Sequence, residues 1–397
     1  MTEIANTGEK HTIDGVEMEF VYVLDTEAPV EIMIWLPQLK AFCTAEDMTH
    51  NMHNLQTLRG AKVRNGLLWS KAVDTAIERY GDRVEVSFST HHWPTWGNER
   101  IVDYWEAQRD MYRYLHDQTL HLANRGLTPD EIAEEMKLPA SLASQFNCRG
   151  YYGTLSHNVK AQYDLYFGWF DGNPAHLNPL PPSELGAKYV EAIGGADKVL
   201  EVAKASYAKG EYRWVATLLD NLVFAEPENK EARQLLSDTY SQLGYQAESG
   251  PWRNFYLTGA QDLLKKAVPY TSKLINDGVL SQMDMGTLLD YCAIQLNGEK
   301  AGGKEAVINI NFTDTKEKVM LMLKNGVLNH RLGSQDKKAD LTMEIAKMDF
   351  VKLFFGRTDL QTLRKTNKVK TTGDTKAIDM IRSACEPADP NFNIVLP

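Results

Sequence analysis

The sequence predicts an α+β protein of several domains, because the pattern of its apolar residues changes twice along 397 residues. Residues 1 to about 100 alternate apolar strands with one helix, and the next stretch, to about 270, has helical periodicity. From about 272 onward, period-2 segments return between helices. Since domains commonly hold roughly 50–200 residues, we divide the chain into 1–110, 111–271 and 272–397.

The first segment reads as strands arranged around one helix. The apolar stretches "MEFVYVLD" (18–25) and "EIMIWLPQ" (31–38) predict neighbouring strands with a turn between them. Residues 40–46 predict a third strand and "RVEVSFST" (83–90) a fourth. An amphipathic helix is expected between these two, over 67–82, where Gly81 ends the pattern. Such alternation of strand and helix is typical of α/β proteins.

The middle segment is predicted to be helical throughout. "TPDEIAEEM" (128–136) begins with a threonine cap, a proline at the first helical position and acidic residues in the first turn. Residues 194–247 read as pairs of helices with Gly210 at a turn, and one unit resembles a tetratricopeptide repeat. Because only about one such unit is present, we expect helix hairpins and not a repeat array.

The last segment predicts a sheet flanked by helices. Alternating apolar residues mark strands within 305–312, 318–332 and 339–346. The second of these stretches contains Asn325-Gly326, a pair that favours the type I′ turn of a tight β-hairpin.

Composition excludes several classes of protein. The net charge is −10, the pI is about 5.6 and no basic tract is present, so nucleic acid is not expected as a partner. No run of 18 apolar residues is present, so no membrane span is expected. The polar start shows no signal peptide, which makes the cytoplasm the default expectation. The cysteines form no CxxC pair and predict neither a disulfide framework nor a thiolate zinc site: Cys43, Cys148, Cys292 and Cys385.

Three chemically useful side chains lie at or just beyond predicted strand ends. These are Glu27 in "DTEAP", Glu46 in "CTAED" and His91 in "STHHW". Strand ends meet at one edge of a layered α/β fold, and two carboxylates with one imidazole suit a divalent ion such as Zn²⁺ or Mn²⁺. The alternative is that both acids are solvated in loops and that His91 is a hydrogen-bonded strand terminus. Spacing alone favours this second interpretation.

Two further clusters are rich in groups that could bind a substrate. Residues 49–64 bring together His50, His53, Asn54 and Arg59, and arginine and asparagine could hold sulfate, phosphate or carboxylate. A capped helix with polar surface residues would show the same pattern. Residues 149–182 are rich in aromatic side chains and contain His157, which fits either a packed aromatic crossing or the wall of an apolar substrate site.

Taken together, these stretches resemble the alkyl sulfatases of the metallo-β-lactamase superfamily, which hydrolyse sodium dodecyl sulfate and related esters. The resemblance runs over the whole chain in the family's order. The sequences that carry it are "DTEAPVE", "AEDMTHNMHNLQTLRGAKVR", "FSTHHWPTWGNE" and "RGYYGTLSHNVKAQYDLYFGWFDGNPAHLNPLPP".

The resemblance implies an architecture for each segment. Residues 1–110 would be the C-terminal part of a metallo-β-lactamase αβ/βα domain, and 111–271 a helical dimerisation domain with tetratricopeptide-like hairpins. Residues 272–397 would form a sterol-carrier-like α+β domain, a fold that encloses an apolar tunnel. A homodimer formed through the helical domain, with an alkyl sulfate or another apolar small molecule as ligand, is the expected assembly.

The resemblance also implies roles for individual residues. Glu27, Glu46 and His91 match ligands of a two-zinc centre. Asn54, Arg59 and His157 match positions that hold the sulfate group, with Tyr163 as a weaker candidate nearby. His92, beside a ligand position, is expected to support its loop.

One family motif is missing. The H-x-H-x-D-H sequence that supplies three histidines and an aspartate to the zinc centre occurs nowhere in these residues. We therefore expect hydrolysis of primary alkyl sulfates such as dodecyl sulfate to be weak or absent in this chain alone, with partial zinc occupancy at most. This fits either a truncated product or an upstream half on a separate polypeptide.

The alternative function is a non-catalytic dimer that binds apolar ligands. The parent family is often exported, but no export signal is visible here.

Overall fold

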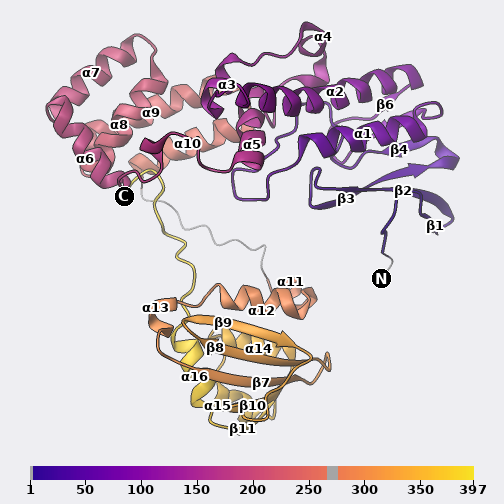
Figure 1. The fold of residues 1–397 in the computed structure, drawn as a ribbon, viewed down its shortest axis with the longest axis vertical. Helices are drawn as coiled ribbons and strands as arrows, with labels where there is room; N and C mark the ends of the chain where they lie inside the picture. The colour runs from indigo at the N-terminus through magenta and orange to yellow at the C-terminus, as the bar shows by residue number, and fades with distance from the viewer. Residues whose placement is uncertain (1–2, 266–275) are drawn as a thin grey trace. The chain divides into compact units, whose positions relative to one another are not determined.

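The computed structural model describes residues 3–265 and 276–397 and contains two compact units (Figure 1). The first unit comprises Met1–Lys266 together with Asn393–Pro397, and the second comprises Ala267–Phe392. The expected boundary between residues 271 and 272 lies outside the described residues. Strands with helices, an all-helical part and a second sheet with helices confirm the predicted α+β class.

The first unit contains a six-stranded sheet whose strands follow one another in chain order. All neighbouring pairs are antiparallel except β4 and β5, which are parallel because helix α1 (Gly66–Tyr80) crosses over between them. The strands are β1 (Lys10–Ile13), β2 (Val16–Leu24), β3 (Val30–Leu36), β4 (Ala41–Cys43), β5 (Val86–Phe88) and β6 (Thr95–Trp96). The third and fourth predicted strands are confirmed but are shorter than expected.

Strand directions place three loops at one edge of this sheet. Strands β2 and β4 both run antiparallel to β3, and β5 runs parallel to β4, so β2, β4 and β5 end on the same side. The side chain of Asn65 caps α1 by accepting hydrogen bonds from the backbone of Leu67 and Leu68. The helix buries Trp69 and Tyr80 completely: Tyr80 packs on Trp35 and Phe42 of the sheet, and Trp69 stacks on Tyr112. This packing anchors the chain on both sides of the loop that follows β4.

Helices make up the rest of the first unit. The helix α3 begins at the predicted threonine cap, where Thr128 and Glu131 form a reciprocal capping box. Gly210 has a φ of 79° at the turn between α7 and α8, as its place in the repeat-like unit indicates. The helices are α2 (Asn98–Ala123), α3 (Pro129–Glu135), α4 (Ala140–Ala143), α5 (Leu155–Phe167), α6 (Pro182–Ile193), α7 (Ala196–Ala208), α8 (Tyr212–Ala225), α9 (Lys230–Gln246) and α10 (Gly250–Leu264). Short 3₁₀ turns are η1 (Pro37–Leu39), η2 (Phe146–Cys148) and η3 (Pro174–His176).

The second unit contains a five-stranded sheet in the order β11-β10-β7-β8-β9. Asn325 and Gly326 both have positive φ, 54° and 75°, which confirms the predicted hairpin between β8 and β9. The strands are β7 (Ala306–Phe312), β8 (Lys318–Lys324), β9 (Val327–Leu332), β10 (Leu341–Ile345) and β11 (Val369–Gly373). The helices are α11 (Asp277–Gln282), α12 (Met285–Ala293), α13 (Gly298–Ala301), α14 (Lys347–Phe354), α15 (Leu360–Lys365) and α16 (Lys376–Ser383).

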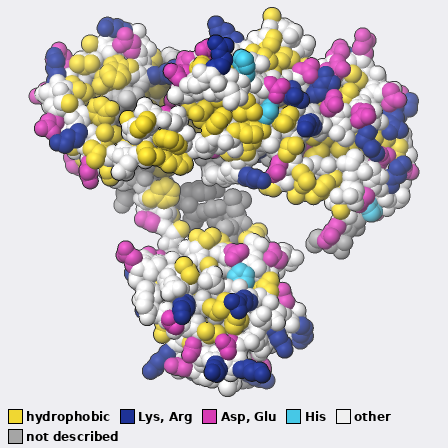
Figure 2. Space-filling view, viewed as in Figure 1, with side chains coloured by type: hydrophobic (Ala, Val, Ile, Leu, Met, Phe, Trp, Pro, Cys, Tyr) yellow, Lys and Arg dark blue, Asp and Glu magenta, His cyan; other side chains and the backbone are white. Residues whose placement is uncertain are grey.

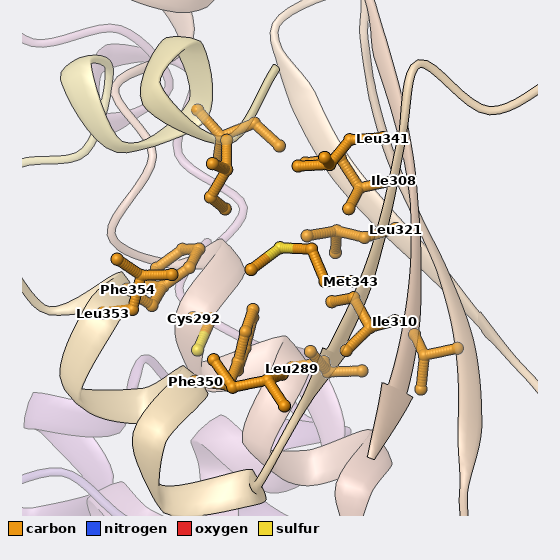
Figure 3. Packing of buried hydrophobic residues seen from close by; sticks show 14 of the residues in the cluster. Leu289, Cys292, Ile308, Ile310, Leu321, Leu341, Met343, Phe350, Leu353 and Phe354 are labelled. Carbon is orange, nitrogen blue, oxygen red and sulfur yellow. The ribbon is translucent and has the colours of Figure 1, made fainter. Parts of the chain in front are cut away.

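The core of the second unit lies between its sheet and its helices. Figure 3 shows Ile310 and Met343 of the sheet facing Phe350 of α14 and Leu289 of α12. All four side chains are buried, so period-2 and helical apolar patterns meet in one continuous core. Among the described residues, no helix is long and apolar enough to cross a membrane.

Candidate metal and oxyanion site

The three loops at the edge of the first sheet surround a cavity of about 560 Å³. Glu27 comes from the turn after β2, Glu46 from the loop after β4, and His91 from the loop after β5. The residues that line the cavity are Glu27, Glu46, Thr49, Asn51, His53, Arg59, Arg64, His91, His92, Tyr151 and Tyr152. Predicted ligands from three separate loops therefore meet in one place.

Glu46 lies between two imidazoles. Its Oε1 is 2.9 Å from Nε2 of His91, and its Oε2 is 3.5 Å from Nε2 of His53. The contact with His53, followed by that with His91, lowers the pKa of Glu46 to about 2 against the opposing effect of partial burial. Glu46 is therefore a carboxylate at neutral pH.

His53 is a candidate ligand that the sequence prediction did not include among the metal ligands. Ligand atoms of Glu27, Glu46 and His53 all lie within 4.8 Å of one another, close enough to share one ion. The Nδ1 atom of His53 donates to the backbone oxygen of Asn54 at 2.9 Å, which leaves Nε2, the ring nitrogen on the side of Glu46, as the atom that would bind an ion. His91 reaches this trio through Glu46 and is more exposed.

Arg64 ties two of the loops together. Its Nη2 pairs with Oε1 of Glu27, and its Nε donates to the Glu27 backbone oxygen. Its Nη1 donates to the backbone oxygen of Asn54 at 3.0 Å and to the Asn54 side chain. This guanidinium is largely buried, whereas Arg59 lines the cavity from an exposed position. The cavity thus offers two guanidinium groups beside the carboxylates, an arrangement that can bind an oxyanion.

Two acidic residues lie behind the cavity wall. Glu31 accepts a hydrogen bond from the backbone N–H of Glu46 at 3.1 Å, and burial, helped by the charges of Glu27 and Glu46, raises the pKa of Glu31 to about 7. Burial also raises the pKa of Asp47 well above its ordinary value. Contacts from the Thr26 side chain and the Glu27 backbone oppose this shift only in part. Such a concentration of acidic groups around two imidazoles fits a divalent cation, and zinc accepts these donors.

The loop that carries His91 is held by its neighbour. His92 has a φ of 70°, which is uncommon for a residue with a side chain, and its Nε2 is 2.9 Å from Nδ2 of Asn51. His50 stacks on Trp93, with ring centroids 4.9 Å apart. His92 thus contacts Asn51 in the loop after β4, and its role in supporting the loop stays a prediction.

Three predicted sulfate-binding residues are not brought into the cavity lining. Asn54 is buried against Arg64, and Tyr163 packs against Phe167 with ring centroids 4.7 Å apart. His157 uses both ring nitrogens elsewhere: Nε2 is 2.7 Å from the Gln56 backbone oxygen, and Nδ1 accepts from the Trp252 indole at 2.9 Å. Direct sulfate contacts by these three residues remain predictions. Arg59 does line the cavity, as the prediction requires.

Family models match most of the helical part and the second unit. Residues 128–266 match "Alkyl sulfatase dimerisation", and residues 273–397 match "Alkyl sulfatase C-terminal". The chain belongs to the alkyl sulfatase family. The family recognised from the sequence motifs is therefore confirmed.

Curated relatives extend the match to the first segment of the chain. The chain is 46% identical over 396 residues to a linear primary-alkylsulfatase of Pseudomonas sp and 44% identical over 396 residues to an (R)-specific secondary-alkylsulfatase of Pseudomonas sp. Both matches cover at least 98% of this chain and 59% of the relative. The solved structure of the inverting sec-alkylsulfatase Pisa1 from Pseudomonas sp. has a TM-score of 0.96 and 43% identity, covering 99% of this chain and 62% of that one. The chain thus spans about three fifths of the length of these relatives.

Proposed function

We propose that the cavity of the first unit is the metal- and sulfate-binding part of an alkyl sulfate ester hydrolase. The convergence of Glu27, Glu46 and the imidazoles of His53 and His91 beside two guanidinium groups carries this proposal. The relatives, which are named alkylsulfatases, support the substrate class. Primary esters such as dodecyl sulfate are the expected substrates.

Zinc is the ion that these donors fit. Glu27, Glu46 and His91, with His53 beside them, would hold it, and the family's two-zinc centre would use the same carboxylates. A bound zinc ion supplies Lewis-acid chemistry that polarises an ester oxygen and offsets negative charge. The H-x-H-x-D-H ligands are not among these 397 residues, so we expect partial zinc occupancy and weak turnover from this chain alone.

The protein's own groups would bind and orient the sulfate. Arg59 is free to move toward an oxyanion from its exposed position, and Arg64 is already fixed at the wall by Glu27. Asn54 would act by holding Arg64, and His157 by holding the backbone at Gln56. Such preorganised donors stabilise the charge that develops on a departing sulfate. Tyr163 remains the weaker candidate.

A homodimer through the helical part is the proposed assembly. This part matches the family's dimerisation model, and α6, α7 and α8 line an apolar groove of about 410 Å³. Hydrophobic side chains are exposed over these helices (Figure 2), including Trp214 and Tyr189, each about half exposed. Light scattering at micromolar concentration should give twice the 44.9 kDa mass of the chain, and a monomer mass would contradict the proposal.

A non-catalytic dimer that binds apolar ligands is the second candidate, and the missing H-x-H-x-D-H motif favours it. An assay of dodecyl sulfate hydrolysis separates the hydrolase from the binding protein. The purified chain is assayed with added zinc, at detergent concentrations too low to unfold it. Turnover that is lost in Glu46→Gln supports the hydrolase. Bound amphiphile without turnover, at saturating zinc, supports the binding protein.

A further inference from the structure

The second unit contains a cavity of its own, of about 200 Å³, between the end of α14 and the residues that follow α16. Its lining combines an arginine, an amide and two phenylalanine rings with other groups: Gln295, Phe354, Phe355, Gly356, Arg382, Cys385, Glu386 and Pro387. None of these residues belongs to the cavity of the first unit. The mixture of one cation with aromatic walls distinguishes this cavity from the hydrophobic core beside it.

The guanidinium of Arg382 is held in this cavity by weak contacts. Its Nε atom is buried and has no hydrogen-bond partner among the described residues. Its Nη1 lies 3.7 Å from Asp379 Oδ1, and its Nη2 lies 3.5 Å from the Thr358 backbone oxygen, both at the limit of a useful interaction. Because a buried donor without a partner is costly, an acceptor that enters the cavity would be stabilised there.

The acidic groups nearby leave room for an anion. Glu386 also lines the cavity, but its carboxylate is already paired with Lys300 and accepts from Asn297 at 2.9 Å. Asp379 is mostly exposed, so solvent screens its pairing with Arg382. Asp359 also lies within electrostatic reach of Arg382, but its carboxylate is held by the backbone and hydroxyl of Thr362. Gln295 adds an amide that can donate to the same oxyanion.

The aromatic side of the cavity indicates what the anion is attached to. Phe354 is buried in the core and contacts Phe355, whose ring lies 5.6 Å from that of Tyr291. Figure 3 shows Phe354 beside Cys292 and Phe350, so the cavity wall continues into the packed core. A polar head at Arg382 would therefore have apolar surface directly beside it, which suits a ligand with an alkyl segment.

We propose that this cavity is a binding site for the oxyanion head of an anionic amphiphile, with Arg382 as the group that recognises the head. Two sources share this chemistry: an alkyl sulfate, which would make the site a second one for the proposed substrate, and a fatty carboxylate. The proposal does not depend on metal binding or hydrolysis in the first unit, so failure of either leaves it intact.

Cys385 provides a reporter that reads this cavity alone. The thiol is half-buried in the cavity lining, whereas the half-buried Cys43 lies on the sheet of the first unit and serves as an internal control. The rate of iodoacetamide alkylation of each cysteine, mapped by peptide mass spectrometry on the full chain, is measured with octyl sulfate, octanoate, 1-octanol or inorganic sulfate. All amphiphiles are kept below their micelle-forming concentrations.

We expect octyl sulfate or octanoate to slow alkylation of Cys385 at least about threefold without slowing that of Cys43. Whichever of these two anions binds more tightly identifies the source of the oxyanion head. Calorimetry with the better ligand should show affinity at least tenfold weaker for Arg382→Gln, with Arg382→Lys intermediate. Equal protection by 1-octanol, absence of protection by both anions, or unchanged affinity in a folded Arg382→Gln would each overturn the proposal. The alkylation measurement uses the chain without substitutions, so it tests the proposal even where an Arg382 variant fails to fold.

Discussion

Nε2 of His91 lies 2.9 Å from Oε1 of Glu46, although 45 residues separate them in the chain. The contact joins the loop after β4 to the loop after β5, two parallel strands whose ends meet at one sheet edge. With His53 on its other oxygen, Glu46 is the centre of the proposed metal site.

Glu46→Gln should weaken zinc binding at least about tenfold, because an amide keeps the shape of the side chain but removes the anionic ligand. Calorimetric titration of zinc into the purified chain measures this. Glu85→Gln is the matched control, since Glu85 is an exposed acid paired with Lys40 and does not line the cavity. Equal zinc affinity in the two variants would contradict the assignment of Glu46.

His53→Gln should weaken zinc binding as much as His91→Gln, because the geometry places His53 with Glu27 and Glu46. His50→Gln is the control: His50 lies three residues away and stacks on Trp93 outside the cavity lining. The same titration applies, with thermal unfolding to verify that each variant folds. A His53 variant with unchanged affinity would leave His91 as the sole imidazole ligand among the described residues.

Sequence patterns predicted those parts of the fold whose causes are local. Period-2 apolar runs predict strands because side chains alternate across a sheet, and Asn325-Gly326 predicts a hairpin because both residues tolerate positive φ. His53 was not predicted as a ligand because its placement depends on distant contacts. Its backbone N–H donates to the Tyr112 hydroxyl, 59 residues away.

The roles of the two arginines could not be predicted from the sequence either. Arg59 and Arg64 are five residues apart in one loop, and both could have faced Glu27. The structure pairs Arg64 with Glu27 because α1 starts directly after Arg64, with Asn65 as its cap. Sequence spacing does not contain that information.

Gly326→Ala should destabilise the second unit more than Gly303→Ala. Both glycines have positive φ, 75° and 72°, so alanine costs about 1–2 kcal/mol of backbone strain at each. At Gly326 an added Cβ would also lie 2.9 Å from the Gly298 backbone oxygen, whereas at Gly303 nothing lies within 4 Å. Urea denaturation should show the larger loss for Gly326→Ala, and equal losses would show that the hairpin can shift away from Gly298.

The free energy of unfolding of the first unit should fall at acidic pH, because Glu19 becomes protonated there. Burial alone would raise the pKa of Glu19, but hydrogen bonds from Arg79 and Tyr80, both at 2.9 Å, and the charge of Lys10 outweigh burial and lower it below its ordinary 4.5. A lowered pKa in the folded state gives stability that is present above about pH 4.5 and is lost as pH falls through the lower value.

Glu19→Gln should therefore cost about 1.5–3 kcal/mol at pH 7, the range for hydrogen bonds to a charged group, and progressively less below pH 4.5. Urea denaturation at pH 7, 5, 4 and 3 measures the trend. Glu17→Gln is the control, because the Glu17 side chain is about half exposed and lies 3.9 Å from Lys10. A cost for Glu19→Gln that stays constant down to pH 3 would exclude this linkage.

X-ray absorption at the zinc edge tests most directly whether the cavity of Glu27, Glu46, His53 and His91 binds zinc. We expect nitrogen and oxygen ligands at about 2.0–2.2 Å with outer scattering from imidazole, and we expect this signal to be lost in the Glu27→Gln, Glu46→Gln double variant. Sulfur ligands at about 2.3 Å, or the same spectrum in the double variant, would contradict it.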